Sequence, residues 1–101
     1  MAEASLEIKE KAFEQQVHNL ARSLGWLYYH TWRSKFSEPG FPDCVLVKGG
    51  RTIYAELKTE KGKVTTAQQQ WLDALAAAGN EVYLWRPSDY EEICGVLEFK
   101  E

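Results

Sequence analysis

The chain has 101 residues, of which 45% are apolar and 27% charged, and its formal net charge is −3. This length predicts one domain, spanning residues 1–101, and the acidic balance argues against nucleic-acid binding through bulk positive charge. No apolar run approaches the roughly 20 residues of a membrane-spanning helix, and the charged N-terminus is untypical of a signal peptide. Two isolated cysteines, Cys44 and Cys94, indicate a reducing, cytoplasmic environment.

The N-terminal third predicts a helix followed by a strand. Apolar residues recur at helical spacing over residues 6–24, with Ser5 as a possible N-cap and Gly25 as a stop signal. The aromatic stretch 26–32 has β propensity and predicts the first strand.

A hairpin follows a loop at residues 33–42. Residues 43–48 and 51–58 read as two strands joined by Gly49 and Gly50, a favoured hairpin dipeptide. We therefore expect an antiparallel pair with a short turn.

The C-terminal part predicts helix, strand and helix. Thr65 and Gln68 form a capping-box pattern that opens a helix over residues 66–78. Residues 81–86 read as a strand, and Ser88 is a possible cap of a last helix that ends near residue 97.

The predicted order is α-β-β-β-α-β-α, which indicates an α/β (α+β) fold. The strands at 51–58 and 81–86 are linked through a helix and should be parallel, whereas the first three should form an antiparallel meander. The result is a mixed four-stranded sheet flanked by helices.

Charged residues interrupt the predicted hairpin. A two-residue turn at Gly49-Gly50 places Asp43 opposite Glu56, with Lys58 on the same face. Such facing carboxylates can share a proton, pair with Lys58, or bind a divalent cation. A charged cluster on an exposed sheet face is the alternative without function.

The helices add further polar candidates. On a helical wheel Glu10 falls about 60° from Phe13, inside the apolar stripe, and Glu14 lies at about 100° on its flank. A buried carboxylate needs a partner, so Glu10 suggests a third acid at the same site. Gln68 also faces the sheet, although the capping box already explains it, and we interpret His30 as a hydrogen-bonded histidine rather than a ligand.

The middle of the chain is locally basic. Residues 33–63 hold seven Lys or Arg and four Asp or Glu, which permits a small nucleic-acid contact despite the net negative charge.

Several motifs along the chain form one longer pattern. "GFPD" is followed thirteen residues after Asp43 by "ELK", residues 56–58. The longer pattern includes "GW..YH", "AELKTEKGKVT..Q..WL" and "EVYLWRP.D" and extends from about Glu10 to Leu97. Together these motifs resemble the VRR-NUC (virus-type replication-repair nuclease) branch of the PD-(D/E)XK nucleases, in its stand-alone, phage-type form.

The resemblance implies a restriction-endonuclease-like αβββαβ core and assigns roles to residues. Asp43, Glu56, Glu10 and the main-chain carbonyl of Leu57 match metal ligands, and Glu10 matches the helical acid better than Glu14. Lys58 matches the catalytic lysine and Gln68 the family's glutamine. The cofactor implied is Mg²⁺ or Mn²⁺.

The implied activity is a metal-dependent endonuclease that cuts branched or flapped DNA, such as Holliday junctions, in repair, recombination or phage replication. Arg33, Lys35, Lys61 and Lys63 flank the site and are candidate contacts to the phosphate backbone. A homodimer is expected, and its interface could use whichever aromatic side chains are exposed among Trp26, Tyr28, Trp32 and Phe36, with membership of the core as the alternative for most of them. The alternatives are a non-catalytic module that binds DNA junctions or ends, and a restriction-type enzyme that needs a separate specificity subunit.

Overall fold

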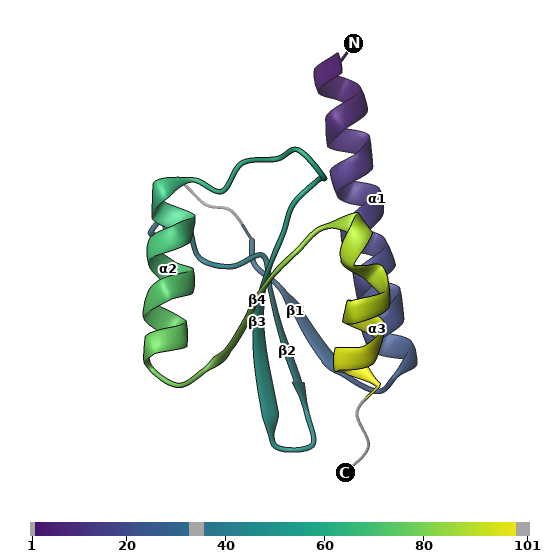
Figure 1. The fold of residues 1–101 in the computed structure, drawn as a ribbon, viewed down its shortest axis with the longest axis vertical. Helices are drawn as coiled ribbons and strands as arrows, with labels where there is room; N and C mark the ends of the chain where they lie inside the picture. Colours follow the sequence, from purple (N-terminus) through teal and green to yellow (C-terminus); the bar gives the residue numbers. More distant parts are fainter. Residues whose placement is uncertain (1, 33–35, 99–101) are drawn as a thin grey trace.

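A computed structural model describes residues 2–32 and 36–98. Its elements follow the predicted order, and Figure 1 shows α2 on one side of the sheet with α1 and α3 on the other. The helices are α1 (Ala2–Ser23), α2 (Thr66–Ala77), the 3₁₀ turn η1 (Pro87–Asp89) and α3 (Tyr90–Leu97). The strands are β1 (Leu27–His30), β2 (Cys44–Lys48), β3 (Arg51–Leu57) and β4 (Glu81–Trp85).

The four strands form one mixed sheet in the order β1-β2-β3-β4. The first two pairings are antiparallel and the β3–β4 pairing is parallel, which confirms the predicted topology. Gly49 and Gly50 both have positive φ angles, of 54° and 79°, and the hairpin register pairs Val45 with Tyr54 and Cys44 with Ala55. This is the register expected from a two-residue turn, and its continuation brings Asp43 opposite Glu56.

The core lies mainly between the sheet and the pair α1 and α3. The buried apolar side chains of α1 meet those of β2 and β3, and α3 closes the other side of the cluster. Its fully buried members include Val17, Ala21, Leu46, Ile53, Leu57, Trp85, Ile93 and Leu97.

The ends of α1 show one correct and one wrong prediction. The helix begins at Ala2, so Ser5 lies inside it and is not its cap. Its end is as expected, because Gly25 adopts a φ of 88° and lets the N–H of Trp26 reach the carbonyl of Ala21 at 2.9 Å. Local signals therefore located the end of the helix better than its start.

Of the two later helices, α2 has its predicted N-terminal cap and α3 does not. The capping box of α2 is present: Gln68 N–H donates to Thr65 Oγ1, and Thr65 N–H donates to Gln68 Oε1. Ser88 is not the cap of α3, since it lies within η1 and Asp89 occupies the N-cap position. The N–H of Ser88 donates to the Glu60 carboxylate, which ties the loop after β3 to η1.

The four aromatic residues considered for a dimer interface divide between surface and core, with Trp32 and Phe36 exposed. Trp26 is buried with its Nε1 donating to the carbonyl of Leu97, and Tyr28 is half-buried. The edge strand β1 and its neighbour β2 carry a further exposed apolar surface formed by Leu27, Val47 and Tyr29. Leu27 pairs directly with Val47, and strand alternation places Tyr29 on the same face.

Among the described residues, no helix combines the length and apolarity that a membrane crossing requires.

Candidate active site

Asp43 is held at the point where β2 begins and β3 ends. Its Oδ2 atom accepts a 2.8 Å hydrogen bond from the N–H of Leu57, and its main-chain carbonyl accepts one from Thr31 at 2.8 Å. The carboxylate is therefore fixed against the last residue of β3 through one of its two oxygens.

The loop before Asp43 requires glycine for steric reasons. Gly40 has a φ of 95°, and a Cβ atom there would lie 2.5 Å from the main-chain carbon of Ala67 in α2. The next residue, Phe41, packs edge-on against Tyr54 and Trp71, with ring centroids 6.0 and 5.1 Å apart. The close backbone approach at Gly40 thus sets the path of the chain into Asp43.

Glu56 is a buried carboxylate that forms no hydrogen bond to the described residues. Its exposure is 1%, and both Oε1 and Oε2 are buried. Strand alternation places it on the same face as Tyr54, toward α2. Its pKa is raised to about 7, first by burial and then by the negative charge of Asp43, while Lys58 acts in the opposite direction.

Lys58 follows directly after β3. Its N–H donates to the carbonyl of Trp85 at 2.9 Å, which extends the β3–β4 pairing by one residue. Its Nζ atom lies 3.6 Å from Oε2 of Glu56, and its side chain is only 12% exposed. The three residues expected to share a face therefore meet at one end of the sheet.

An open pocket of about 350 Å³ adjoins Asp43, and both α1 acids line it. Glu10 and Glu14 are each half-buried there, together with His30, Thr31 and Trp32. Burial is the main reason that the pKa of the Cys44 thiol is raised to about 12, and the charges of Asp43 and Glu14 add to that rise. Both helical acids thus face the site, and their positions in the pocket do not decide between Glu10 and Glu14 as the helical ligand.

The described part of the chain contains no group of three His, Cys, Asp or Glu side chains close enough to form a complete metal-ligand set. The donor chemistry nevertheless fits a hard cation, because the unpartnered oxygens of Glu56 are the ligands that Mg²⁺ prefers. The acids lie around the site, but their side chains are not close enough together to form a complete set of metal ligands.

Gln68 is 8% exposed at the start of α2, and its amide oxygen is used by the capping box. This local role accounts for a buried glutamine at that position.

The loop after Lys58 is organised by Arg86, a residue that the sequence patterns did not single out. Its Nη1 atom donates to the carbonyls of Thr59, Glu60 and Gly62 at 2.6, 3.3 and 2.8 Å. Its place in the sequence could have indicated this role. Arg86 directly follows β4, and β4 runs parallel to β3, which Lys58 directly follows.

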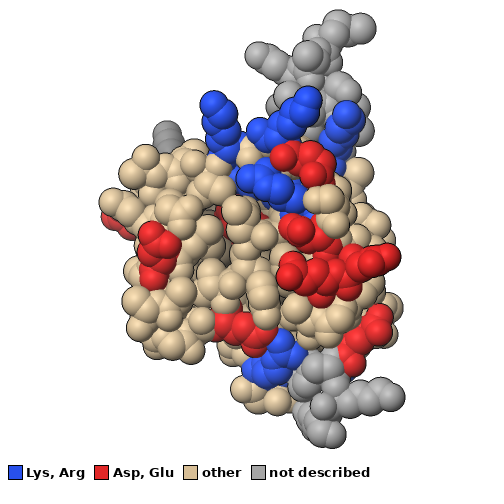
Figure 2. All heavy atoms as spheres, viewed as in Figure 1, with Lys and Arg blue, Asp and Glu red and all other residues tan. Residues whose placement is uncertain are grey.

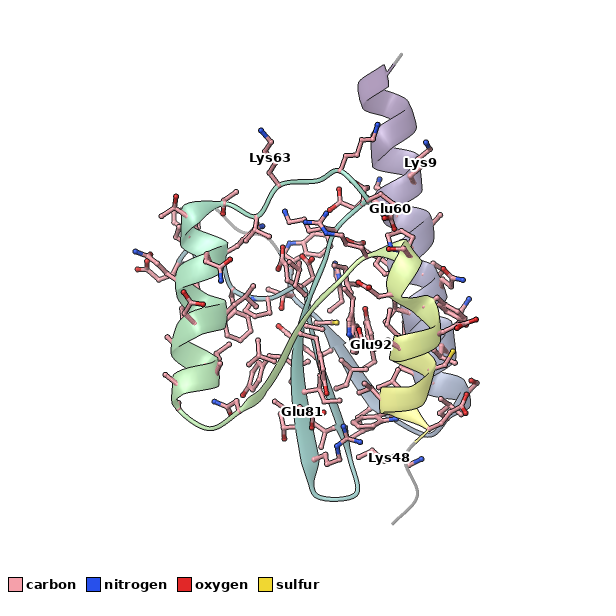
Figure 3. All side chains as sticks on the ribbon, in the orientation of Figure 1. Lys9, Lys48, Glu60, Lys63, Glu81 and Glu92 are labelled. Carbon is pink, nitrogen blue, oxygen red and sulfur yellow. The ribbon has the colours of Figure 1, made fainter. Side chains whose placement is uncertain are left out.

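The predicted DNA-contacting lysines lie on this loop. Lys61 and Lys63 are exposed, and Figure 3 shows Lys63, Glu60 and Lys9 at the same end of the molecule. In Figure 2 most of the basic side chains in view lie at this end, above the acidic side chains near α3, and a separate basic group lies at the lower end. Arg33 and Lys35 lie outside the described residues.

The fold and this site define a restriction-endonuclease-like domain with a mixed four-stranded sheet. A family model, the VRR-NUC domain, matches residues 3–89. The chain therefore belongs to the VRR-NUC domain family and is a nuclease-type domain.

Solved structures agree with the fold. One named "VRR_NUC domain" has a TM-score of 0.72 at 20% identity, with 92% of this chain and 98% of that chain covered. A "VRR_NUC domain protein" has a TM-score of 0.68 at 18% identity, with 89% and 85% covered. Hjc from Archaeoglobus fulgidus, described as a Holliday junction resolvase from an archaeal hyperthermophile, has a TM-score of 0.57 at 19% identity, with 76% and 69% covered. A sequence comparison with curated proteins gives no significant match.

Proposed function

We propose that this protein is a metal-dependent, structure-selective DNA endonuclease. The observation that carries the proposal is the buried carboxylate of Glu56, which forms no hydrogen bond to the described residues and lies beside Asp43 and Lys58. A native protein rarely leaves such a group unsatisfied unless a ligand or a proton completes it. VRR-NUC membership supports a nuclease as the reason for this arrangement.

Asp43, Glu56 and the main-chain carbonyl of Leu57 are the residues that would hold Mg²⁺ or Mn²⁺, with Glu10 as the helical ligand and Glu14 as the competing choice. When bound, the cation would supply positive charge to the scissile phosphate and lower the pKa of the attacking water. The oxygen donors of these residues match the preference of both ions.

The chain's own residues would perform the remaining steps. Lys58 orients the attacking water and contacts a phosphate oxygen, since its short distance to Glu56 keeps the ammonium at the site. The water oxygen attacks phosphorus and gives up a proton to solvent, the bond from phosphorus to the leaving sugar oxygen breaks, and that oxygen takes up a proton from solvent. We assign to Gln68 a hydrogen bond from its amide nitrogen to the water or the phosphate.

Contacts to the DNA backbone are assigned to the basic residues around the site. Lys61 and Lys63 are exposed on the loop that Arg86 holds, and Arg33 and Lys35 belong to the same proposal. No element of the described chain carries a base-reading motif, so we infer selection by DNA structure. The resolvase activity in the description of Hjc supports branched DNA, including Holliday junctions, as the substrate class.

A homodimer and a cytosolic location complete the proposal. One domain offers one site, whereas symmetrical cutting of a junction requires two. The apolar face of Leu27, Val47 and Tyr29 is the interface that we propose.

The test is cleavage of labelled four-way junction, flap and linear duplex with Mg²⁺ or Mn²⁺. The parent chain should cut branched DNA, and Asp43→Ala and Lys58→Ala should each lose at least about 100-fold in rate. Asp73→Ala, at an exposed position of α2, is the matched control and should cut normally. Undiminished cleavage by Asp43→Ala would remove the metal-site assignment.

A non-catalytic DNA-binding module is the second candidate. The described residues contain no complete three-ligand set, which is the observation that favours it. It predicts junction binding that survives chelation, without strand scission by the parent chain under any metal.

A further inference from the structure

We propose that Trp32 is a stacking platform for an unpaired nucleobase next to the scissile phosphate. The inference rests on the proposed function, because it takes the site of Asp43 and Glu56 as the place where the phosphate is bound. It adds that the protein recognises an unpaired base in its DNA substrate.

Trp32 differs from the other tryptophans in its exposure. The structure describes all four tryptophans of the chain: Trp26 and Trp85 are buried, Trp71 is half-buried, and Trp32 is 78% exposed. The indole of Trp71 donates to the carbonyl of Pro39 at 3.1 Å, and that of Trp26 to Leu97 at 2.9 Å. Most of the Trp32 ring is therefore uncovered, and tryptophan is enriched at binding interfaces because its ring offers a large apolar face.

The backbone fixes Trp32 beside the carboxylates. Thr31, the residue before it, donates its N–H to the carbonyl of Asp43 at 2.8 Å and its hydroxyl to the carbonyl of Pro42 at 2.6 Å. These two bonds tie the segment beyond β1 to the start of β2. Trp32 consequently lines the same pocket as Asp43 and Glu10.

This position suits a base attached to the scissile nucleotide. Aromatic side chains bind nucleobases through their faces and tolerate any sequence, because every base has such a face. In a continuous duplex each base face is covered by its neighbours. A platform at this pocket therefore selects DNA with an uncovered base, as at a flap, an end or an open branch point.

A second copy of the chain is the competing occupant of the Trp32 surface. The proposed dimer face begins at Leu27, at the opposite end of β1 from Trp32. The surroundings of Trp32 are instead polar, with Glu10, Lys11, Glu14 and His30 in the same pocket. A polar pocket beside carboxylates fits a nucleotide better than an apolar protein contact.

The experiment measures DNA binding apart from cleavage. A flap DNA that carries 2-aminopurine at the unpaired position beside the branch is titrated with protein in Ca²⁺, and linear duplex is the reference. The parent should quench the 2-aminopurine fluorescence. Trp32→Ala should bind the flap roughly 10-fold more weakly and lose the quench, with little change for duplex.

Three variants separate aromatic stacking from a merely apolar contact. Trp32→Phe should keep most of the flap affinity, and Trp32→Leu should behave like Trp32→Ala, since leucine is apolar but has no aromatic face. Leu84→Ala removes an exposed apolar side chain of β4 outside the pocket and should leave the quench intact.

Unchanged flap affinity in Trp32→Ala, or equal affinity in the Leu and Phe variants, would overturn the inference. A loss of binding that coincides with a dimer-to-monomer change in sedimentation would assign Trp32 to a second copy and would also overturn it. Quenching and tight binding by a parent that never cuts DNA would uphold the platform while the proposed nuclease activity fails. Normal cutting of branched DNA by the parent, together with unchanged flap binding by Trp32→Ala, would uphold the proposed nuclease activity and overturn the platform.

Discussion

One carboxylate oxygen of Glu56 lies 3.6 Å from Nζ of Lys58. Glu56 is near the end of β3, and Lys58 follows directly after that strand. The distance exceeds the roughly 2.7–2.9 Å of a charge-assisted hydrogen bond, so the ammonium is near the carboxylate without satisfying it. Because Glu56 is 1% exposed, bulk solvent does not reach the carboxylate either. The carboxylate is therefore available to a proton or a cation. Its charge should affect both the stability of the protein and the binding of a divalent cation.

Replacement of Glu56 by Gln should stabilise the metal-free protein at pH 8. The substitution removes a buried charge whose pKa is raised to about 7 by burial, and the gain should be roughly 1–2 kcal/mol. Thermal unfolding in EDTA, followed by circular dichroism, measures it. The matched control is Glu81→Gln, because Arg51 lowers the pKa of Glu81 through a hydrogen bond and loss of that charge should destabilise. A lower melting temperature for Glu56→Gln would contradict the prediction.

Stability and cation binding should depend on pH in opposite senses. The folded pKa of Glu56, about 7, lies above the ordinary value of 4.5, so the folded state holds the extra proton between these values. Metal-free stability should therefore fall as pH rises from about 4.5 to 7. Mn²⁺ must displace that proton, so its affinity should be roughly tenfold lower at pH 6 than at pH 8.

Calorimetric titration with Mn²⁺ in two buffers of different ionisation enthalpy measures both the affinity and the protons released. Proton release should decline above pH 7, and Glu56→Gln should lack it. Affinity that is independent of pH would show that Glu56 is not displaced by the cation.

Loss of Arg86 should weaken DNA binding through the loop that carries Lys61 and Lys63. The guanidinium of Arg86 holds three carbonyls of that loop, and Arg86→Gln should release it and reduce junction affinity about 3- to 10-fold. The dependence of affinity on salt should also become shallower, since fewer lysines are positioned on phosphates.

Arg51→Gln is the matched control for Arg86→Gln. Arg51 bonds the carboxylate of Glu81 and the carbonyl of Val96, at the opposite end of β3 from Lys58. Its loss should lower the melting temperature by a similar amount without a change in the salt dependence of DNA binding. Equal effects of both substitutions on that dependence would show that Arg86 acts only through stability.

Replacement of Gly40 by Ala should cost more stability than the same change at Gly79. Both residues have positive φ angles, of 95° and 91°, but an added Cβ meets the Ala67 backbone at 2.5 Å in one case and nothing within 4 Å in the other. We expect about 1 kcal/mol for Gly79→Ala and at least about 2 kcal/mol more for Gly40→Ala. Urea unfolding measures both, and equal losses would show that the loop before Asp43 can move away from α2.

The sequence alone determined the parts that depend on short stretches of chain. The Gly49-Gly50 turn set the hairpin register, the Thr65–Gln68 box started α2, and Gly25 ended α1. Each rests on backbone conformations and hydrogen bonds within a few residues, which local sequence specifies. From that register alone, Asp43, Glu56 and Lys58 could be assigned to one site.

Only the tertiary structure decided the features that need partners distant in the chain. Ser88 lies in η1 rather than at the start of α3, and its N–H donates to the distant Glu60. Arg86 gained a role because the loop after β3 returns to it. The helical wheel favoured Glu10, but the folded chain brings Glu14 to the same pocket. Burial and pairing are set by which elements pack together, and no local pattern contains that information. The same packing buried Trp26 and left Trp32 exposed beside the acids, although both belong to one aromatic stretch of the sequence.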